Sequence, residues 1–508
     1  MIVLFNPLST TPGKQPLPLS LMALAAVLEG REPWQLVDGN LSPDPAGEIL
    51  DILRAASPTS PHLLAVTVMP GPQLTQAVHV CRRVKAAMPE LSIVWGGYFP
   101  TQHADVVLRS GFVDFVVRSQ GEVPLRQLID VLKSAGKSGG KSAEKSERKS
   151  SEALRGVGGL AWMSDSGLVT NAVGSLTPLD ELPDFPYGRV DMSRYIHANY
   201  LGRRTVAHNS SFGCPFSCSF CAVVAMSGRH WMPQSPARIE RVLRRLVADY
   251  RVDAVQMHDM DFFISEARTA EFAERIADLG LKWWALGRVD TLMRYTDATW
   301  QKMAQSGLKM VFSGAESGSD DTLAAMNKGG RSAARLTLEL AHRMRKYGVV
   351  PEFSFVLGSP PDPQRDVSDT FDFIRRLKTI NPATEIVLYT YTPVPQEGQL
   401  YAAAQDAGFR FPETLDDWAK PEWQQLSMRR GDGIPWIDQT VRRRVRNFER
   451  VINAFYPTVT DPRLTGWRRA VLKAVSAWRY RLQWYDAPYE LRALHRLVHY
   501  QRPETTGF

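Results

Sequence analysis

Residues 211–224 read SFGCPFSCSFCAVV and follow Thr205–Ser210, a candidate strand that begins a strand–helix alternation. Three of the chain's four cysteines, Cys214, Cys218 and Cys221, lie here with Cys-x3-Cys-x2-Cys spacing. Three thiols cannot all pair as disulfides, and a disulfide-stapled secreted protein uses many more cysteines. Three thiolates this close can hold three corners of a [4Fe–4S] cube and leave the fourth iron open to a small molecule. The stretch therefore predicts a reactive iron–sulfur centre.

The alternative metal at this triad is zinc, with His208 or His230 as the fourth ligand. Structural zinc sites usually pair their ligands as two short-spaced dyads. No second dyad follows the triad, and the fourth cysteine, Cys81, lies in another predicted domain, where we expect a buried helix residue. The number and spacing of the candidate ligands therefore favour an iron–sulfur cluster over zinc.

Composition sets the wider frame. The chain has 508 residues, 44% hydrophobic and 22% charged, with a net charge of +8. This balance excludes a mostly disordered or collagen-like chain, and the length suggests two to four domains. No window approaches the roughly 20 apolar residues that span a bilayer. The first residues carry no basic region before their apolar run, so we expect a buried strand there and not a signal peptide.

The chain around and after the triad repeats a strand–helix alternation. Six such repeats predict a partial (β/α)6 barrel, and barrels carry their chemistry on the loops at the carboxyl ends of the strands. We assign this barrel, with a connecting segment before it, to residues 158–405. The connecting segment includes an expected hairpin of Leu160–Met163 and Leu168–Asn171. The expected barrel strands are Thr205–Ser210, Asp253–Met257, Lys282–Leu286, Lys309–Phe312, Glu352–Val356 and Glu385–Tyr389.

Residues 1–134 show the same alternation with shorter helices. It predicts an α/β domain with a doubly wound, Rossmann-like parallel sheet covered on both faces, whose ligands lie beyond the carboxyl ends of the strands. Residues 135–157 are rich in Lys, Ser and Gly and predict a flexible linker. The expected strands are Ile2–Phe5, Trp34–Val37, Leu63–Val68, Ser92–Trp95 and Phe112–Val117.

Residues 406–508 lose the strand pattern and predict a basic helical C-terminal region. From Arg429 to Phe508 there are 16 Lys and Arg against 7 Asp and Glu, which leaves the rest of the chain near neutral. Such a tail suits an anionic membrane surface, an acidic partner or nucleic acid, of which we do not expect nucleic acid; a solvated helical face is the simpler alternative. An apolar stripe fits either an amphipathic helix lying on a membrane or, the favoured alternative, a terminal helix packed on the barrel. The stripe comprises Trp467, Val471, Val475, Trp478, Leu482 and Tyr485.

With the triad, Phe220 before its third cysteine and its place on the first barrel loop, the chain resembles the radical S-adenosylmethionine (radical SAM) superfamily. Further segments look like the motifs that follow the cluster loop and the next strands of that superfamily. In the last of them, Gln396–Gly398 departs from the family's Thr-Pro-x-Pro-Gly-Thr pattern. The segments are GRHWMPQSPARIERVL (228–243), HDMDFF (258–263), GRVD (287–290), SGAESGSDDTLAAMNKG (313–329), FSFVLGSPPDPQRDVSDTFDFI (353–374) and TPVPQEGQL (392–400).

The resemblance implies that the open iron binds S-adenosylmethionine, and that an electron from the cluster cleaves it to a 5′-deoxyadenosyl radical. We expect Glu316 to bind ribose hydroxyls or the methionine ammonium, and Arg288 to pair with the methionine carboxylate. Phe220, Asp259 and Asp261 are further expected contacts. For each single residue the alternative is a structural salt bridge or a cap.

The N-terminal domain looks like the cobalamin-binding domain that precedes the barrel in one branch of that superfamily. The matching segments are residues 13–30, 37–40, 65–72, 95–101 and 118–125. A Rossmann dinucleotide site is rejected, because the loop after the first strand, NPLSTTPGKQPLP, lacks Gly-x-Gly-x-x-Gly. The resemblance implies cobalamin-binding roles for Ser20, Asp38, Thr67, Val68, Met69, Gly96, Gly97, Tyr98, Gly121 and Glu122.

Two features of this domain bear on the ligand. Gly96 and Gly97 let the backbone approach a bulky planar molecule, although a lone Gly-Gly pair otherwise indicates a tight turn. Residues 1–134 contain no Asp-x-His-x-x-Gly motif, so we expect no histidine below the cobalt and contacts near Val66–Met69 instead.

The resemblance implies a cobalamin-dependent radical SAM enzyme. The leading hypothesis is a methyltransferase that acts on an unactivated carbon through the 5′-deoxyadenosyl radical and methylcobalamin. The alternative is an oxidative cyclase or ring-rearranging enzyme resembling the anaerobic magnesium-protoporphyrin ester cyclases; a non-catalytic cobalamin sensor is a third hypothesis. We expect a small-molecule or lipid substrate, flavodoxin or ferredoxin as reductant, and a cytoplasmic location, with peripheral membrane association through the tail as a variant.

Overall fold

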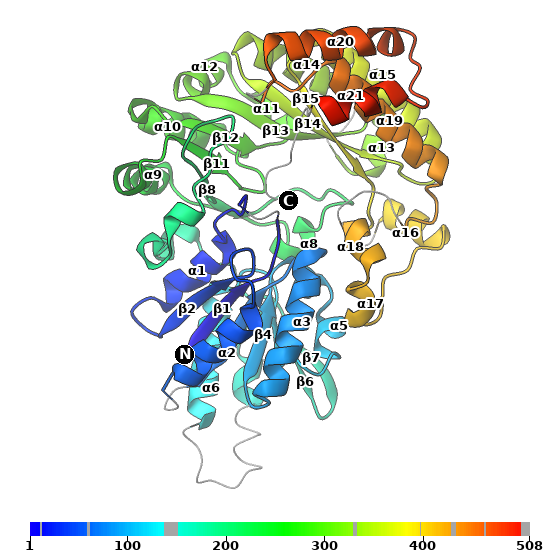
Figure 1. The fold of residues 1–508 in the computed structure, drawn as a ribbon. Helices are drawn as coiled ribbons and strands as arrows, with labels where there is room; N and C mark the ends of the chain where they lie inside the picture. Colours follow the sequence, from blue (N-terminus) through cyan, green and yellow to red (C-terminus); the bar gives the residue numbers. More distant parts are fainter. Residues whose placement is uncertain are drawn as a thin grey trace.

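The computed structural model describes residues 1–10, 13–57, 61–136, 151–328, 333–396, 398–427, 433–461 and 464–498. Two mainly parallel sheets make up the chain, one in the N-terminal domain and one in the barrel. In Figure 1 the N-terminal domain (blue and cyan) lies below the barrel (green and yellow), and the C-terminal helices (red) lie at the top. The α/β class, the doubly wound N-terminal sheet and the six-stranded partial barrel are confirmed.

The N-terminal sheet has the strand order β2-β1-β3-β4-β5-β6-β7. Its first five strands are parallel, and the order reverses between β1 and β3, so the ligand-binding crevice of such a sheet lies at their carboxyl ends. These strands are β1 (Ile2–Asn6), β2 (Trp34–Asp38), β3 (Leu63–Thr67), β4 (Ser92–Gly96) and β5 (Phe115–Val117).

Helices cover both faces of this sheet, as the unbroken apolar runs of its strands require. Alternate residues of β1 enter different cores: Ile2 and Leu4 pack beneath α1 and α6, and Val3 and Phe5 beneath α2 and α3. The helices are α1 (Leu19–Leu28), α2 (Pro45–Ala55), α3 (Pro72–Ala87), α4 (Tyr98–Gln102), α5 (Ala104–Leu108) and α6 (Glu122–Gly136). Cys81 is a fully buried residue of α3, as expected.

The expected hairpin forms, but it extends the N-terminal sheet. β6 (Leu160–Ser164) pairs antiparallel with β5, and β7 (Gly167–Thr170) pairs with β6. The hairpin covers what would otherwise be an open sheet edge at β5. The sequence pattern places the hairpin in the connecting segment before the barrel, because the pattern of a hairpin does not reveal which sheet the hairpin joins.

The expected linker is only partly a linker in the described residues. Residues 137–150 lie outside them, whereas residues 151–155 are helical and Val157 is buried in the N-terminal core. Leu154 packs against the same core, so this end of the low-complexity stretch has an anchor. The domain limits 1–134, 135–157, 158–405 and 406–508 otherwise stay predictions.

The barrel sheet has the order β15-β14-β13-β12-β11-β8, with every pairing parallel. Sequential strands are neighbours, as repeated right-handed β/α units require. The strands are β8 (Thr205–His208), β11 (Ala254–Met257), β12 (Lys282–Leu286), β13 (Leu308–Glu316), β14 (Val350–Leu357) and β15 (Glu385–Thr390).

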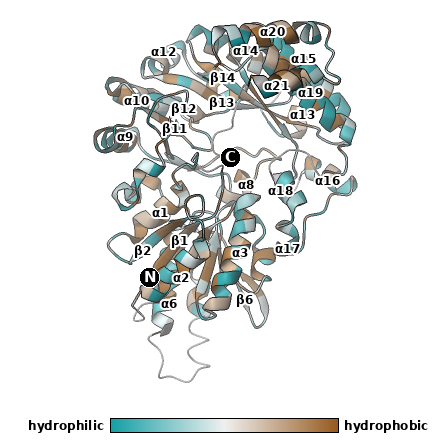
Figure 2. Ribbon diagram, in the orientation of Figure 1, coloured by the Kyte–Doolittle hydropathy of each residue, from teal (hydrophilic) through white to brown (hydrophobic). Residues whose placement is uncertain are grey.

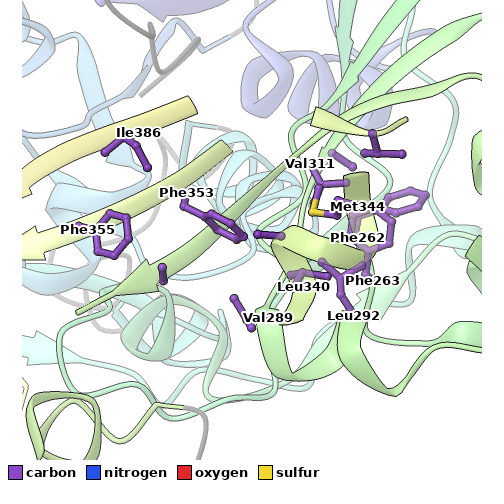
Figure 3. Close-up of a cluster of buried hydrophobic side chains, with 14 of the residues drawn as sticks. Phe262, Phe263, Val289, Leu292, Val311, Leu340, Met344, Phe353, Phe355 and Ile386 are labelled. Atoms are coloured by element: carbon purple, nitrogen blue, oxygen red, sulfur yellow. The ribbon is translucent and has the colours of Figure 1, made fainter. Parts of the chain in front are cut away.

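The barrel core lies between these strands and the outer helices. Figure 3 shows Val311, Phe353 and Ile386 from three successive strands, together with Leu340 and Met344 from α14, in one buried cluster. The outer helices are α9 (Pro236–Tyr250), α10 (Glu266–Ile276), α11 (Val289–Arg294), α12 (Asp297–Gln305), α13 (Asp320–Ala325), α14 (Ala333–Lys346) and α15 (Pro363–Ile380).

Short elements complete the connecting segment and the first barrel loop. β9 (Ser211–Gly213) and β10 (Trp231–Pro233) form a two-stranded antiparallel ribbon around α8 (Val223–Ser227). Single 3₁₀ turns are η1 (Leu179–Glu181), η2 (Tyr187–Arg189), η3 (Met192–Arg194) and η4 (Ala277–Leu279).

After the barrel the chain returns to the N-terminal domain. The segment 409–424, which we call the strap, places Leu415 and Trp418 in the core beside α3. Arg82 pairs with Asp416 at 2.8 Å, and Figure 1 shows α17 beside the N-terminal domain. The elements here are α16 (Gln399–Asp406), α17 (Leu415–Trp418) and α18 (Pro421–Ser427).

The chain then goes back to the barrel in α19 (Gln439–Phe455), α20 (Gly466–Arg481) and α21 (Tyr489–Leu497), which confirms the helical C-terminal region. α20 packs on the barrel, as favoured, but through Leu472, Ser476 and Tyr480. Of the predicted stripe, only Val475 and Tyr485 contact the core. No helix in the described part of the chain is long and apolar enough to cross a bilayer. Figure 2 shows brown, apolar segments mainly on the strands.

Candidate active site between the two domains

The three cysteines lie on the loop that follows β9, at the carboxyl end of the first barrel strand. Gly213 precedes them with a φ of 81°, and a Cβ there would lie 2.3 Å from the His230 carbonyl oxygen. Only glycine allows this close approach with positive φ. Cys218 is buried and the other two cysteines are half-buried, with the Cys221 amide donating to the Cys218 carbonyl at 3.1 Å.

The cysteine loop is fastened to the loop that follows β13. The Ser219 amide donates to the Met326 carbonyl at 3.0 Å, and the Ser219 hydroxyl donates to the Ala325 carbonyl at 3.0 Å. The Asn327 side chain donates to the Ser217 carbonyl at 2.9 Å. Backbone positions, which composition does not reveal, therefore fix where the cysteines lie.

The donor set fits an iron–sulfur cluster better than a single ion. Burial, with Asp261 nearby, raises the pKa of the Cys214 thiol to about 12, so its thiolate needs a cationic partner. In the described part of the chain, no three Cys, His, Asp or Glu side chains converge to hold one metal ion. A cube does not need them to, because each cysteine binds a different iron.

The histidines weighed as zinc ligands have other contacts. His208 is buried and its Nδ1 lies 3.3 Å from the Tyr187 hydroxyl, whereas the His230 Nδ1 lies 3.1 Å from the Ser227 carbonyl. Neither completes a tetrahedral site with the triad.

Arg288 connects the third barrel loop to the cluster loop. Its Nη1 donates to the Cys218 sulfur at 3.0 Å, and its guanidinium carbon lies 3.9 Å from the centre of the Phe216 ring. The other side of the fork is bidentate with Asp290, at 2.9 and 3.0 Å. The expected pairing of Arg288 with a methionine carboxylate would therefore compete with Asp290, and it stays a prediction.

Asp261 offers an acceptor within the same site. Its Oδ1 accepts from the Phe263 amide at 3.1 Å, and its buried Oδ2 has no hydrogen-bond partner. Burial raises the pKa of this carboxyl group to about 7, although Arg288 and Lys328 act against that rise. An unpaired buried oxygen beside the cysteine loop fits a polar ligand such as the zwitterionic end of S-adenosylmethionine.

Asp259 is used within the protein. It accepts from the Ser210 amide at 3.1 Å, the Ser210 hydroxyl at 2.9 Å and the Ser211 hydroxyl. Arg268 donates to the same Ser210 hydroxyl at 2.8 Å and to the Gln234 carbonyl at 2.9 Å. Asp259 and Arg268 together hold the turn into the cysteine loop. The geometry therefore favours a structural role for Asp259 over contact with S-adenosylmethionine. Sequence reasoning missed Arg268, because an arginine on an amphipathic helix is normally exposed.

Glu316 ends β13 with a φ of 64° beside a shift in strand register. Its carboxylate is paired with Lys328, whose ammonium lies 5.6 Å from the centre of the Phe220 ring. A Cβ on Gly314 would lie 1.9 Å from the Glu316 Oε1. Gly314 therefore makes room for a buried ion pair, and Lys328 is a site residue that the sequence analysis quoted in a motif but did not single out.

A cavity lies between the domains, next to the start of the cysteine loop, although the cysteines, Asp261, Arg288 and Glu316 are not among the described residues that line it. Its empty volume is about 1240 Å³, including space open to solvent. The barrel contributes Asn209, Phe212, Met226 and Met260, and Leu182, Pro183 and Phe185 of the connecting segment close one side. The N-terminal domain contributes six of the predicted cobalamin-binding residues, namely Ser20, Thr67, Gly96, Gly97, Gly121 and Glu122.

The cavity walls fit a large, mostly apolar molecule with polar edges. Gly97 has a φ of 97°, and a Cβ there would lie 3.1 Å from the Thr67 hydroxyl, which itself accepts from Ser20 at 3.2 Å. The Ser119 hydroxyl and the Asn209 Oδ1 are buried without hydrogen-bond partners. A corrin, which presents a planar ring and peripheral amides, can use both features. Among the residues that the structure describes, those that line the cavity include no histidine.

The other predicted cobalamin-binding residues do not line this cavity. Val68 is fully buried in the core beneath it, and Met69 is 42% exposed. Asp38 accepts from Asn40 at 2.7 Å and from the Tyr195 hydroxyl at 3.1 Å, so it joins the N-terminal domain to the connecting segment. Tyr98 is the first residue of α4.

Two family models match the chain over most of the region described above. The model of the B12 binding domain matches residues 7–129, and the model of the radical SAM superfamily matches residues 208–374. The second match begins at the end of β8 and ends within α15, so it includes the cysteine triad.

Two curated relatives and one solved structure are similar over most of their length. The uncharacterized methyltransferase PH0819 of Pyrococcus horikoshii is 26% identical over 365 residues, 71% of this chain and 73% of that protein. The anaerobic magnesium-protoporphyrin IX monomethyl ester cyclase of Synechocystis is 24% identical over 381 residues, 73% and 69% of the two chains. The cobalamin-dependent S-adenosylmethionine radical enzyme OxsB with aqua-cobalamin bound has a TM-score of 0.65 at 18% identity, covering 98% of this chain and 75% of OxsB, and so shares the fold.

Proposed function

The chain belongs to the cobalamin-dependent radical SAM enzymes, and from this premise we propose that it is a methyltransferase acting on an unactivated carbon. Its cofactors are a [4Fe–4S] cluster, S-adenosylmethionine and cobalamin. The observation that carries the proposal is the cavity between the domains, which is lined both by the cobalamin-binding segments and by residues beside the cysteine loop. A methyl group and a substrate radical can meet only where the two cofactor surfaces face one space.

When bound, the cofactors supply a carbon radical, from reductive cleavage of S-adenosylmethionine, and a transferable methyl group. The protein's own residues bind and orient them. We propose that Cys214, Cys218 and Cys221 ligate the cluster, with Arg288 holding the Cys218 sulfur in place. Asp261 accepts from a donor of S-adenosylmethionine, and Glu316 does so once it is released from Lys328.

The cavity walls protect the reaction from water. Phe212, Met226 and Met260 line the barrel side, and Phe185 of the connecting segment lies between the domains. Walls that exclude solvent and hold the substrate in place let a radical meet its intended C–H bond before other groups. We propose that Gly96 and Gly97 let the corrin approach β4 and that Ser119 and Asn209 bind its peripheral amides.

Similarity to PH0819, which is named a methyltransferase, supports the proposed methyl transfer. Similarity to the magnesium-protoporphyrin ester cyclase of Synechocystis supports an oxidative cyclase as the second candidate. The two differ in product. Methyl transfer yields a methylated product together with S-adenosylhomocysteine, whereas cyclisation yields 5′-deoxyadenosine without methylation.

The decisive experiment is anaerobic purification with quantitation of iron, sulfide and corrin, followed by incubation with S-adenosylmethionine deuterated in its methyl group, a reductant and extract of the source cells. We expect a deuterated product and S-adenosylhomocysteine. Deoxyadenosine without deuterium transfer would select the cyclase. A Cys218→Ala variant that keeps full function would instead support a cobalamin sensor.

For partners we propose a small-molecule or lipid substrate and a flavodoxin or ferredoxin as electron donor, in the cytoplasm. A one-electron donor is needed because the chain holds no second redox motif among its described residues. Peripheral contact with a membrane through the C-terminal helices is the remaining part of this proposal.

A further inference from the structure

The outer side of α20 is unusually apolar for a surface helix. Five of the twelve large hydrophobic side chains that are exposed in the described part of the chain lie between residues 467 and 484. We call these five residues the aromatic face: Trp467 is 62% exposed, Val471 38%, Trp478 41%, Leu482 70% and Trp484 55%. Monomeric proteins seldom expose such a contiguous set without a binding role.

The aromatic face is distinct from the side of α20 that packs on the barrel. Leu472, Ser476 and Tyr480, spaced four residues apart, are buried, and the Tyr480 ring stacks on Phe455 at 4.3 Å. Trp467, Val471, Trp478 and Leu482 follow a second helical line on the solvent side. α20 therefore has one apolar line for the barrel and another that the fold leaves exposed.

The charges near the aromatic face are mostly positive. Residues 466–498 contain seven Lys and Arg against two Asp and Glu. One of the two acids, Glu490, is bound by the buried Arg479. Lys473 and Arg481 are exposed on α20, so the surface that surrounds the tryptophans is basic.

The tryptophans themselves are held in a fixed arrangement. The Trp478 and Trp484 rings meet edge to face at 5.6 Å, and the Arg479 guanidinium lies 4.6 Å from the centre of the Trp478 ring. Because Arg479 is also bonded to the carbonyls of Asp486 and Ala487, the rings are organised before any partner binds.

From these observations we propose that the aromatic face is a docking surface for an anionic lipid bilayer. Tryptophans prefer the boundary between headgroups and acyl chains, and lysine and arginine beside them contact anionic headgroups. A second copy of the chain suits this face poorly, since two basic surfaces would repel. Figure 1 shows α20 at the end of the molecule opposite the N-terminal domain, so a docked enzyme keeps its cavity clear of the membrane.

The test is vesicle flotation of the full-length, anaerobically prepared protein with phosphatidylcholine vesicles that contain or lack phosphatidylglycerol. We expect flotation only with phosphatidylglycerol, weakening as salt is raised, because screening shortens the reach of exposed charges. Trp467→Gln with Leu482→Gln should lower the bound fraction roughly tenfold or more, since two apolar side chains lose their burial in lipid.

The control removes two other exposed apolar side chains, on a different surface of the molecule. Met163 and Leu168, on the β6–β7 hairpin, are 46% and 44% exposed, and Met163→Gln with Leu168→Gln should float like the wild type. Iron and corrin contents equal to those of the wild type show that each variant is folded, so failure here is separable from failure of the proposed methyl transfer.

Three results would overturn the proposal. The first is no flotation with anionic vesicles, and the second is flotation that the Trp467→Gln, Leu482→Gln variant retains in full. The third is self-association without lipid, seen by analytical ultracentrifugation and lost in that variant, which would make the face an interface between copies.

Discussion

The two halves of the interdomain site use different chemistry. On the N-terminal side, small residues and backbone shape the surface, with Gly96, Gly97 and Gly121 at the carboxyl ends of the strands. On the barrel side, beside the cysteine loop, two ion pairs are largely buried, namely Arg288–Asp290 and Glu316–Lys328. Space and backbone amides suit a large, nearly flat ligand, whereas a small zwitterion and a metal cluster need fixed charges. The contrast implies that the two sides can be disabled separately.

The largest expected effect comes from Cys218→Ala. Loss of one of three ligands should remove most cluster iron and sulfide and abolish turnover, while corrin binding persists, because Cys218 interacts with Arg288 and Lys328, which both belong to the barrel. The measurement is iron, sulfide and corrin content on the same sample.

Cys81→Ala is the matched control, since it removes a cysteine that is fully buried in α3. It should keep iron and corrin and lose about 1–3 kcal/mol of stability, because the buried Trp95 Nε1–H loses the Cys81 sulfur that accepts its hydrogen bond at 3.3 Å and a small cavity is left. Loss of corrin in Cys218→Ala would show that the two sides are coupled.

Gly97→Ala should give the opposite result, with corrin lost and iron retained. The new Cβ would lie 3.1 Å from the Thr67 hydroxyl and 3.2 Å from the Val68 amide nitrogen, at a φ of 97°. We expect corrin affinity to fall at least tenfold, for roughly 1–3 kcal/mol of strain at the binding surface. Titration of the anaerobic apoprotein with hydroxocobalamin, followed by its visible spectrum, measures this.

Gly111→Ala tests whether backbone strain alone, without a new steric contact at the binding surface, lowers the affinity for corrin. Gly111 also has positive φ, 75°, and no atom lies within 4 Å of its would-be Cβ. It should lower stability and leave corrin affinity unchanged. Equal losses of affinity in the two variants would mean that close approach at Gly97 is unimportant.

Lys328→Met tests the charged side. It leaves the buried Glu316 carboxylate without its cation and should lower stability by about 3–5 kcal/mol, as for other broken buried pairs. Thermal unfolding of the variant and of the Glu316→Gln, Lys328→Met double variant gives the comparison. The double variant should recover much of the loss, and no recovery would mean that Lys328 acts independently of Glu316.

The smallest effect is a pH dependence of stability. Burial lowers the pKa of His103 in the N-terminal domain, and of His208 and His258 in the barrel, to about 4. Below pH 6.5 the unfolded chain takes up protons that the native histidines refuse, which lowers stability as pH drops toward 4. Asp261 and Glu352, whose pKa values burial raises to about 7 and about 8, keep protons in the native state and offset part of this fall. Each histidine contributes on the order of 1 kcal/mol for each pH unit in that window.

Unfolding midpoints measured between pH 7 and pH 5 check this effect. His103→Gln should remove the contribution of one histidine, on the order of 1 kcal/mol for each pH unit, from the measured slope. An unchanged slope would place the titration elsewhere.

The sequence predicts the strands of both sheets closely, because strands buried on both faces are unbroken apolar runs. It also places the cysteine triad and six of the residues that line the cavity. Lys328 could not be found in this way: its pairing depends on the bulge in β13 and on the missing side chain of Gly314. Periodicity also predicts the apolar stripe that begins at Trp467. It does not show that α20 packs on the barrel through a different set of residues, among them Leu472 and Tyr480.

The strap has a consequence for how the molecule opens. Between α16 and α19 the chain leaves the barrel, inserts Trp418 among Phe99, His103 and Phe411, and returns. The chain is part of the barrel before and after the strap. The domains therefore cannot separate on that side unless Trp418 leaves its contacts with these aromatic rings. Separation of the domains to admit a corrin must therefore either break these ring contacts or occur away from the strap.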